Sequence, residues 1–93
     1  MGSSRVAVVI KGIPGAPEDK SLKILVERTK TMGELMMWVR VHSKLDSKKA
    51  LFMFIGSGVL PANTQTVGAV HDEHKSRENG YLYITLKAES VFG

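Results

Sequence analysis

The chain ends on a bare glycine, Gly93, shortly after an alternating apolar pattern over residues 81–86. Because glycine has no Cβ, its carboxylate fits a narrow channel and its carbonyl carbon stays open to attack. A protein needs this combination if its own C-terminus is the reacting group. Another enzyme then activates the carboxylate, and an amine accepts the activated acyl group. The alternative interpretation is a frayed chain end, since termini are usually loose.

The 93 residues include no cysteine, which excludes disulfides, thiolate metal sites and cysteine nucleophiles. The chain cannot carry a thioester itself, so in an acyl-transfer cascade it could only be the passenger. It has no glycine-rich phosphate loop and no nucleophile–base motif, and we predict that it is not an enzyme and holds no cofactor. His71 and His74 lack the spaced partners of a structural zinc site, so no metal is predicted.

The net charge of +4 is unevenly distributed. Residues 1–50 hold ten Lys/Arg against five Asp/Glu, whereas residues 51–93 hold three against four. A basic half suits nucleic acid, anionic lipid or acidic peptides, although in a small domain it is more often a solvated face. No strand interleaves aromatic and basic residues as RNA-binding modules do, so we predict no nucleic-acid partner. No apolar run approaches the roughly 20 residues of a membrane span, and we expect a cytoplasmic protein.

The 93 residues make one domain, and the apolar pattern predicts the order strand, strand, long helix, strand, short strand, short helix, strand. A capping box, Thr31-x-x-Glu34, precedes a helical apolar stripe, and Thr66 is the expected N-cap of a shorter helix. The run 51–55 indicates a buried central strand, and Val59–Leu60 before a proline allows only a short edge strand. The remaining predicted strands lie over 5–11, 22–27 and 81–87. The first helix is predicted over 32–44, and the helix that Thr66 caps is predicted to continue through His74.

This order predicts an α+β, ubiquitin-like β-grasp fold, with a mixed sheet, one long and one short helix, and the first and last strands parallel in the middle. The rival for this size is a ferredoxin-like sandwich, which the opening hairpin disfavours. We expect residues 1–4 to be a disordered leader or tag remnant, 5–87 the domain, and 88–93 a flexible conjugation tail ending in Gly93.

The sequence resembles the autophagy ubiquitin-like modifiers almost continuously from Leu22 to Gly93. The segments that carry the resemblance are Ala50–Ile55, Leu60-Pro61, Thr66-Val67-Gly68, Asp72-Glu73-His74, Leu82-Tyr83-Ile84 and Glu89-Ser90-Val91-Phe92-Gly93. The family has a lipid-anchored branch (autophagy-related protein 8, the GABA-receptor-associated type) and a protein-conjugated branch (autophagy-related protein 12). The tail is similar to the first branch. Segment 26–31, and the short stretch before the first strand, favour the second slightly.

The resemblance implies a cascade that ends at the Gly93 carboxylate. An E1-like activating enzyme (autophagy-related protein 7) adenylates it with ATP, and an E2-like conjugating enzyme (autophagy-related protein 10 or 3) hands it to an amine. In the protein-conjugated branch, which we favour here, the amine is a lysine of autophagy-related protein 5, joined by an isopeptide bond during autophagosome formation. In the lipid-anchored branch it is phosphatidylethanolamine, and a processing protease (autophagy-related protein 4) acts on the tail. The resemblance also implies recruitment to the forming autophagosome membrane.

Enzyme recognition is implied at Phe92, which would place the tail in the enzyme channel, and at Phe52 and Phe54, for which core packing is the alternative interpretation. The resemblance also implies two pockets for a peptide that adds a strand to the second strand. One involves Lys23, Leu25 and Tyr81; the other involves Ile24, Val26, Leu35 and Trp38. Glu27 and Lys30 stand where the second pocket is usually apolar, which argues against peptide binding.

Two hypotheses from other classes stay open. The chain could be an unconjugated β-grasp interaction domain with an incidental terminal glycine, or a small basic RNA-binding module. A pool of covalent adducts lost with Gly93→Ala separates the first from a modifier, and a salt-dependent RNA shift identifies the second.

Overall fold

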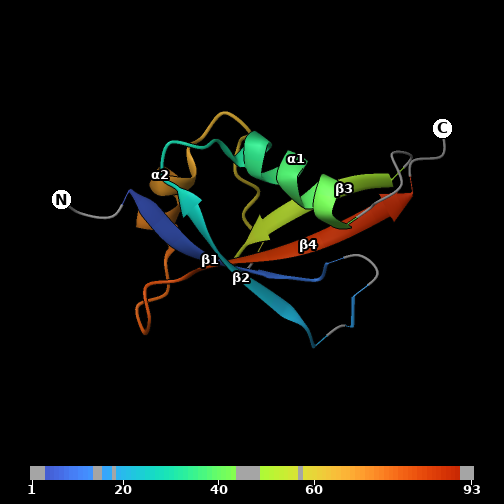
Figure 1. Ribbon diagram of the computed structural model, residues 1–93, viewed down its shortest axis with the longest axis horizontal. Helices are drawn as coiled ribbons and strands as arrows, with labels where there is room; N and C mark the ends of the chain where they lie inside the picture. Colours follow the sequence, from blue (N-terminus) through green and yellow to red (C-terminus); the bar gives the residue numbers. More distant parts are fainter. Residues whose placement is uncertain (1–3, 14–15, 18, 44–48, 57, 91–93) are drawn as a thin grey trace.

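The computed structural model describes residues 4–13, 16–17, 19–43, 49–56 and 58–90. Four strands and two helices follow one another along this part of the chain (Figure 1). In order they are β1 (Arg5–Lys11), β2 (Ser21–Glu27), α1 (Met32–Ser43), β3 (Lys49–Ile55), α2 (Val67–His74) and β4 (Leu82–Ser90).

The strands form one mixed sheet in the order β2-β1-β4-β3. β1 and β2 are an antiparallel hairpin, β1 and β4 are parallel, and β3 and β4 are antiparallel. The first and last strands therefore lie side by side in the middle of the sheet, as predicted. This arrangement confirms the β-grasp fold and excludes the ferredoxin-like alternative, which begins with a strand followed by a helix.

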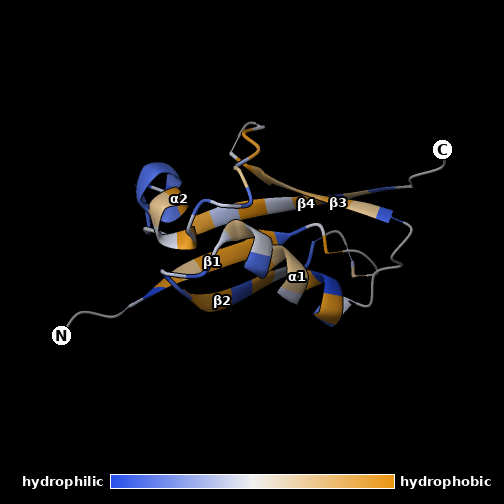
Figure 2. Cartoon of the chain, turned by 90° about the horizontal axis from the view of Figure 1, so that it is seen from above, coloured by the Kyte–Doolittle hydropathy of each residue, from blue (hydrophilic) through white to orange (hydrophobic). Residues whose placement is uncertain are grey.

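The core lies between the two helices and one face of the sheet. Strand residues alternate between the two faces, and along β4 the alternation of apolar and more polar residues can be followed in Figure 2. The fully buried strand side chains include Val8, Ile10, Leu82 and Ile84. The helices add Met32, Leu35, Val39, Val67 and Val70 to the same cluster. Neither described helix is long and apolar enough to cross a membrane.

Both helix starts are capped as the sequence predicts. The Thr31 hydroxyl accepts from the Glu34 N–H at 3.1 Å, and the Glu34 carboxylate accepts from the Thr31 N–H at 3.1 Å. This backbone hydrogen bond from Thr31 holds the pKa of Glu34 below its usual value. The Thr66 hydroxyl likewise accepts from the Ala69 N–H at 3.2 Å. Thr31 and Thr66 also form an isolated bridge, so the two helices start side by side.

The prediction that 51–55 is a buried central strand is wrong. β3 is an edge strand of the described sheet and is buried on one face only. Leu51, Met53 and Ile55 face the core, whereas Phe52 and Phe54 point to the opposite face and are half-buried. A continuous apolar run misled the prediction because aromatic residues occupy the outward positions as well.

Two further predictions are corrected near the chain's second half. Val59–Leu60 is not a strand, because Val59 and Ile55 bond to each other across a tight turn and form only an isolated bridge. β4 begins one residue later than predicted and continues to Ser90, where it pairs with Lys49. Residues 88–90, which we assigned to a flexible tail, are therefore part of the sheet.

Candidate functional site

The free edge of the described sheet at β2 is the first component of the site. β2 pairs with β1 on one side and with no described strand on the other. An edge strand presents unpaired backbone N–H and C=O groups, which can pair with an extended peptide. The backbone of β2 can therefore accept an additional strand.

A groove runs beside this edge, between β2 and α1, with a volume of about 760 Å³. Its apolar lining includes all four residues predicted for the second pocket, Ile24, Val26, Leu35 and Trp38. Ile24 and Val26 alternate toward the core side of β2 and are half-buried, and Leu35 closes the base at 4% exposure. The fold thus brings this predicted set together in one concave surface.

The rest of the groove lining is mainly charged. Glu27 and Lys30, the two residues that we identified as departures from an apolar pocket, both line it. Lys30 Nζ lies 3.6 Å from the Glu34 carboxylate, one helical turn along. Glu34 and Arg5 complete this polar part of the lining. The groove therefore offers apolar contact to a side chain and charges of both signs to its neighbours.

Lys23 and Tyr81, predicted for the first pocket, are in direct contact. The Lys23 ammonium donates to the Tyr81 hydroxyl at 2.5 Å and lies 4.2 Å from the centre of the ring. Leu25, predicted with them, lines the groove and leaves 64% of its surface exposed. A lysine held against a tyrosine beside an exposed leucine suits an aromatic anchor with an acidic neighbour.

Phe52 and Phe54 form a pair on the outward face of β3, with ring centres 6.4 Å apart. Because the core lies on the other face, the core-packing interpretation is wrong for these two rings. Phe52 also lines a smaller cavity of about 390 Å³ together with Leu60 and Pro61. The rings are thus partly available to a partner, and their role in enzyme recognition stays a prediction.

The predicted conjugation residue Gly93 and its neighbour Phe92 lie outside the described residues. The last described residue, Ser90, ends β4 opposite Lys49 at the start of β3. The predicted roles of Phe92 and Gly93 are therefore unchanged by the structure.

Three groove residues were absent from the predicted site: Arg5, Glu34 and Met37. Arg5 is the cross-strand partner of Glu27, which the register of the predicted hairpin could have indicated. Met37 is 63% exposed beside Trp38, and an apolar residue outside the core stripe of a helix is a signal that we did not use. Glu34 was noticed only as a helix cap.

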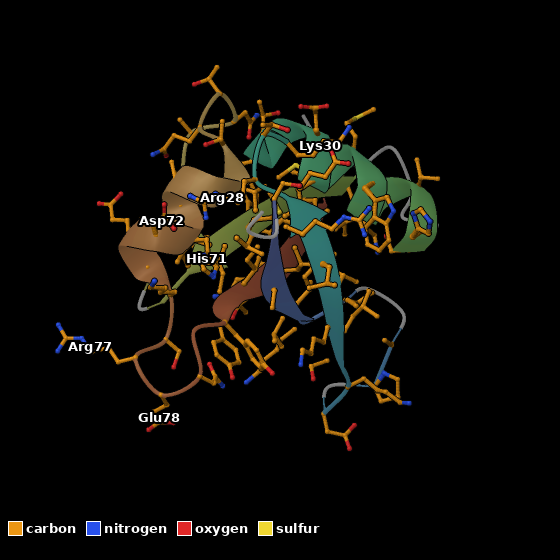
Figure 3. All side chains as sticks on the ribbon, turned by 60° about the vertical axis from the view of Figure 1, so that its left-hand side comes forward. Arg28, Lys30, His71, Asp72, Arg77 and Glu78 are labelled. Carbon is orange, nitrogen blue, oxygen red and sulfur yellow. The ribbon has the colours of Figure 1, made fainter. Side chains whose placement is uncertain are left out.

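The His71 imidazole makes a contact within the fold. Its Nε2 lies 2.7 Å from the Gly80 carbonyl oxygen and ties α2 to the turn before β4 (Figure 3). The neighbouring Asp72 is held by Arg28. His71 and Asp72 are therefore engaged within the fold.

Comparison with known proteins gives matches along nearly the whole chain. Residues 3–93 match the model of a family described as "Autophagy protein Atg8 ubiquitin like". Autophagy-related protein 8b of Arabidopsis thaliana is 35% identical over 91 residues, which cover 96% of this chain and 73% of that protein. Autophagy-related protein 8 of Candida albicans is 33% identical, with 96% and 66% covered.

The fold is also similar to a solved structure. The crystal structure of Trypanosoma brucei ATG8 superposes with a TM-score of 0.76 at 20% sequence identity, covering 97% of this chain and 78% of that one. The mixed sheet and the two helices on one face thus define a ubiquitin-like β-grasp protein. The chain belongs to the Atg8 family of ubiquitin-like autophagy proteins.

The protein-conjugated branch that the sequence analysis favoured is not supported by these matches. Segment 26–31, on which that preference partly rested, forms the end of β2, the turn into α1 and part of the groove lining. This segment covers six residues of one local surface, whereas the family model matches residues 3–93. The longer match therefore decides the branch.

Proposed function

We propose that this protein is a lipid-anchored ubiquitin-like modifier of autophagy, joined through the Gly93 carboxylate to the amine of phosphatidylethanolamine. The observation that carries this proposal is the family match, which extends over the tail as far as residue 93. If residues follow Gly93 in the cell, autophagy-related protein 4 is the protease that removes them. The protein is cytoplasmic and recruited to the forming autophagosome membrane by this bond.

In this cascade the chain contributes an acyl carbon and a shape. Autophagy-related protein 7 uses ATP to form an acyl-adenylate at Gly93 with release of pyrophosphate, and a cysteine of that enzyme displaces AMP to give a thioester. Autophagy-related protein 3 accepts the acyl group by exchange, and the lipid amine then attacks the carbonyl carbon and releases the thiol. Because this chain has no cysteine, it remains the passenger at every step. Autophagy-related proteins 5 and 10 belong to the branch that the comparisons do not support.

Reconstitution tests this proposal directly. The chain is incubated with recombinant autophagy-related proteins 7 and 3, ATP and liposomes that contain phosphatidylethanolamine, and the products are weighed by mass spectrometry. We expect a phosphatidylethanolamine-sized increment that requires ATP and is lost with Gly93→Ala, whereas Ser90→Ala, which keeps the last two residues, retains it.

The same experiment in starved and fed cells separates the alternatives. An isopeptide adduct on one partner lysine would return the protein to the protein-conjugated branch. The absence of every adduct, in vitro and in starved cells, would make the chain an unconjugated interaction domain.

A second activity, docking of cargo-receptor peptides, is favoured by the free edge of β2 beside the groove. The peptide would add a strand to β2, with an aliphatic anchor in the groove and an aromatic anchor beside Lys23 and Tyr81. The charged lining at Glu27, Lys30 and Glu34 would select the residues that flank the aliphatic anchor.

A further inference from the structure

The sheet has a second face, opposite the core, on which neither described helix packs. Both helices contribute side chains to the single buried cluster on the inner face. The outer face carries four half-buried aromatic rings, Tyr81, Tyr83, Phe52 and Phe54. It also carries three exposed lysines, Lys11, Lys23 and Lys87.

The register of the strands arranges these residues in rows across the sheet. In one row Val9 of β1 stands between Lys23 of β2 and Tyr83 of β4. In the next row Thr85 stands between Lys11 of β1 and Phe54 of β3, and in the third Lys87 faces Phe52. Each row thus contains one lysine and one aromatic ring, and successive rows are about 6.6 Å apart along a strand.

The lysine ammonium groups lie over the rings. Lys23 Nζ is 4.2 Å from the centre of the Tyr81 ring, Lys11 Nζ is 5.4 Å from that of Tyr83, and Lys87 Nζ is 5.6 Å from that of Phe54. These distances are within the roughly 6 Å of a cation–π contact. The described acidic residues of the outward strand positions, Glu27 and Glu89, stand at the far ends of β2 and β4. The middle of the face is therefore positive and aromatic.

A ligand that matches this face combines flat π-systems with regularly spaced negative charges. A single-stranded nucleic acid has both, because its unpaired bases stack on aromatic side chains while lysines neutralise its phosphates. A duplex keeps its bases stacked inside, so no base is available to stack on the aromatic rings. An acidic peptide has charges but few flat groups. We propose that the outer face of the sheet, centred on Tyr83, Phe54, Lys11 and Lys87, binds single-stranded RNA or DNA.

We predicted no nucleic-acid partner because no single strand interleaves aromatic and basic residues. In the sheet the interleaving runs across strands, between residues as distant in the chain as Lys11 and Phe54.

Fluorescence anisotropy with the full chain tests this proposal. The probes are labelled oligouridylate and oligothymidylate of about 12 nucleotides, a length that spans such a surface, and a duplex of the same length. We expect saturable binding of the single strands, with little binding of the duplex. The slope of log K against log salt should be near −2, as expected for three lysine–phosphate contacts on a single strand.

The variants separate this face from general basicity. Lys11→Gln with Lys87→Gln should weaken binding and flatten the salt slope by about two thirds. Tyr83→Leu should weaken binding at least about fivefold, the lower end of one lost stacking contact. The control variant Lys75→Gln with Arg77→Gln removes the same charge at exposed positions outside these strands. It should retain the salt slope of the parent protein and its affinity for the single-stranded oligonucleotides. Melting curves verify that each variant is folded.

Three results would overturn the proposal. The first is no saturable binding of either single strand at low salt. The second is equal loss with the outer-face and control pairs of substitutions. The third is that vesicles containing phosphatidylserine, or a glutamate-rich peptide, bind with the same dependence on Tyr83 and Lys87 while the oligonucleotides do not; this result would assign the face to lipid or to peptide.

Discussion

The Arg28 guanidinium grips the Asp72 carboxylate with two parallel hydrogen bonds, 3.1 Å from Nη1 to Oδ1 and 2.5 Å from Nη2 to Oδ2 (Figure 3). The two residues lie 44 positions apart in the chain. Arg28 belongs to the turn between β2 and α1, and Asp72 to α2. The backbone adds a second link, because the Gly68 N–H donates to the Arg28 carbonyl at 3.1 Å. This contact fixes α2 against the turn that leads to the groove.

The stability of the fold should depend on pH through Asp72. The hydrogen bonds from Arg28, and then the one from His71, lower the pKa of Asp72 from 3.8 to about 2. A carboxyl group whose pKa is lower in the folded state than in the unfolded state stabilises the protein at pH values above the unfolded-state pKa. This contribution is lost as the pH falls through the folded-state pKa. The loss should therefore occur between about pH 4 and pH 2.

NMR titration of the Asp72 carboxyl carbon measures this directly, and we expect a midpoint near pH 2. Urea unfolding should show the corresponding acid-dependent loss in the parent and a smaller loss in Asp72→Asn. Both side chains are partly exposed, so the effect should be small and should weaken with salt. A midpoint near 4 would show that the pair is not formed in solution.

Replacing Gly68 by alanine should destabilise the protein. A Cβ at this position would lie 2.8 Å from Arg28 Cβ, and 3.1 Å from its Nε and Cζ atoms. The near end of the arginine side chain cannot move aside without shifting the backbone, and such overpacking costs about 1–3 kcal/mol. Chemical unfolding measures the loss. Ala69→Ser, at the next and exposed position of α2, is the control and should change stability little. Equal stability of the two variants would contradict this contact.

Removing the N-cap of α1 should also lower the stability of the fold. In Thr31→Ala the hydroxyl that accepts from the Glu34 N–H is lost, and removal of such a cap typically costs about 1 kcal/mol. The comparison is Thr29→Ala, an exposed threonine in the preceding turn. Urea midpoints should fall for the first variant and stay unchanged for the second. If both shift alike, the cap does not carry the effect.

Two substitutions on α1 distinguish the groove from the rest of the helix surface. Met37 and Val41 are both largely exposed, at 63% and 70%, but only Met37 is part of the groove lining. Met37→Glu should lower the affinity of the protein for a peptide with aromatic and aliphatic anchors about tenfold, because a carboxylate replaces an apolar contact. Val41→Glu should leave its affinity unchanged.

Isothermal calorimetry gives both affinities, and shifts of the β2 amide resonances locate the peptide. Equal effects of the two substitutions, or shifts confined to other strands, would remove the groove as the docking site.

The local features of this fold follow from the sequence because they depend on near neighbours. The extent of β1 and the starts of α1 and α2 were predicted, since each depends on residues a few positions apart, such as Thr31 and Glu34. The hairpin and the parallel central pair followed from the order of the elements. Four of the apolar groove residues, the set predicted for the second pocket, follow from the family resemblance, and the structure places them together.

What the sequence could not decide depends on register and on contacts between distant segments. The run 51–55 is apolar at both alternating positions, so only the packing of the core on one face of the sheet showed which of its side chains are buried. The Arg28–Asp72 pair joins two surface segments that no periodicity links. The rows of lysines and aromatic rings exist only once four strands are aligned, because strand pairing brings into contact residues that no local pattern relates.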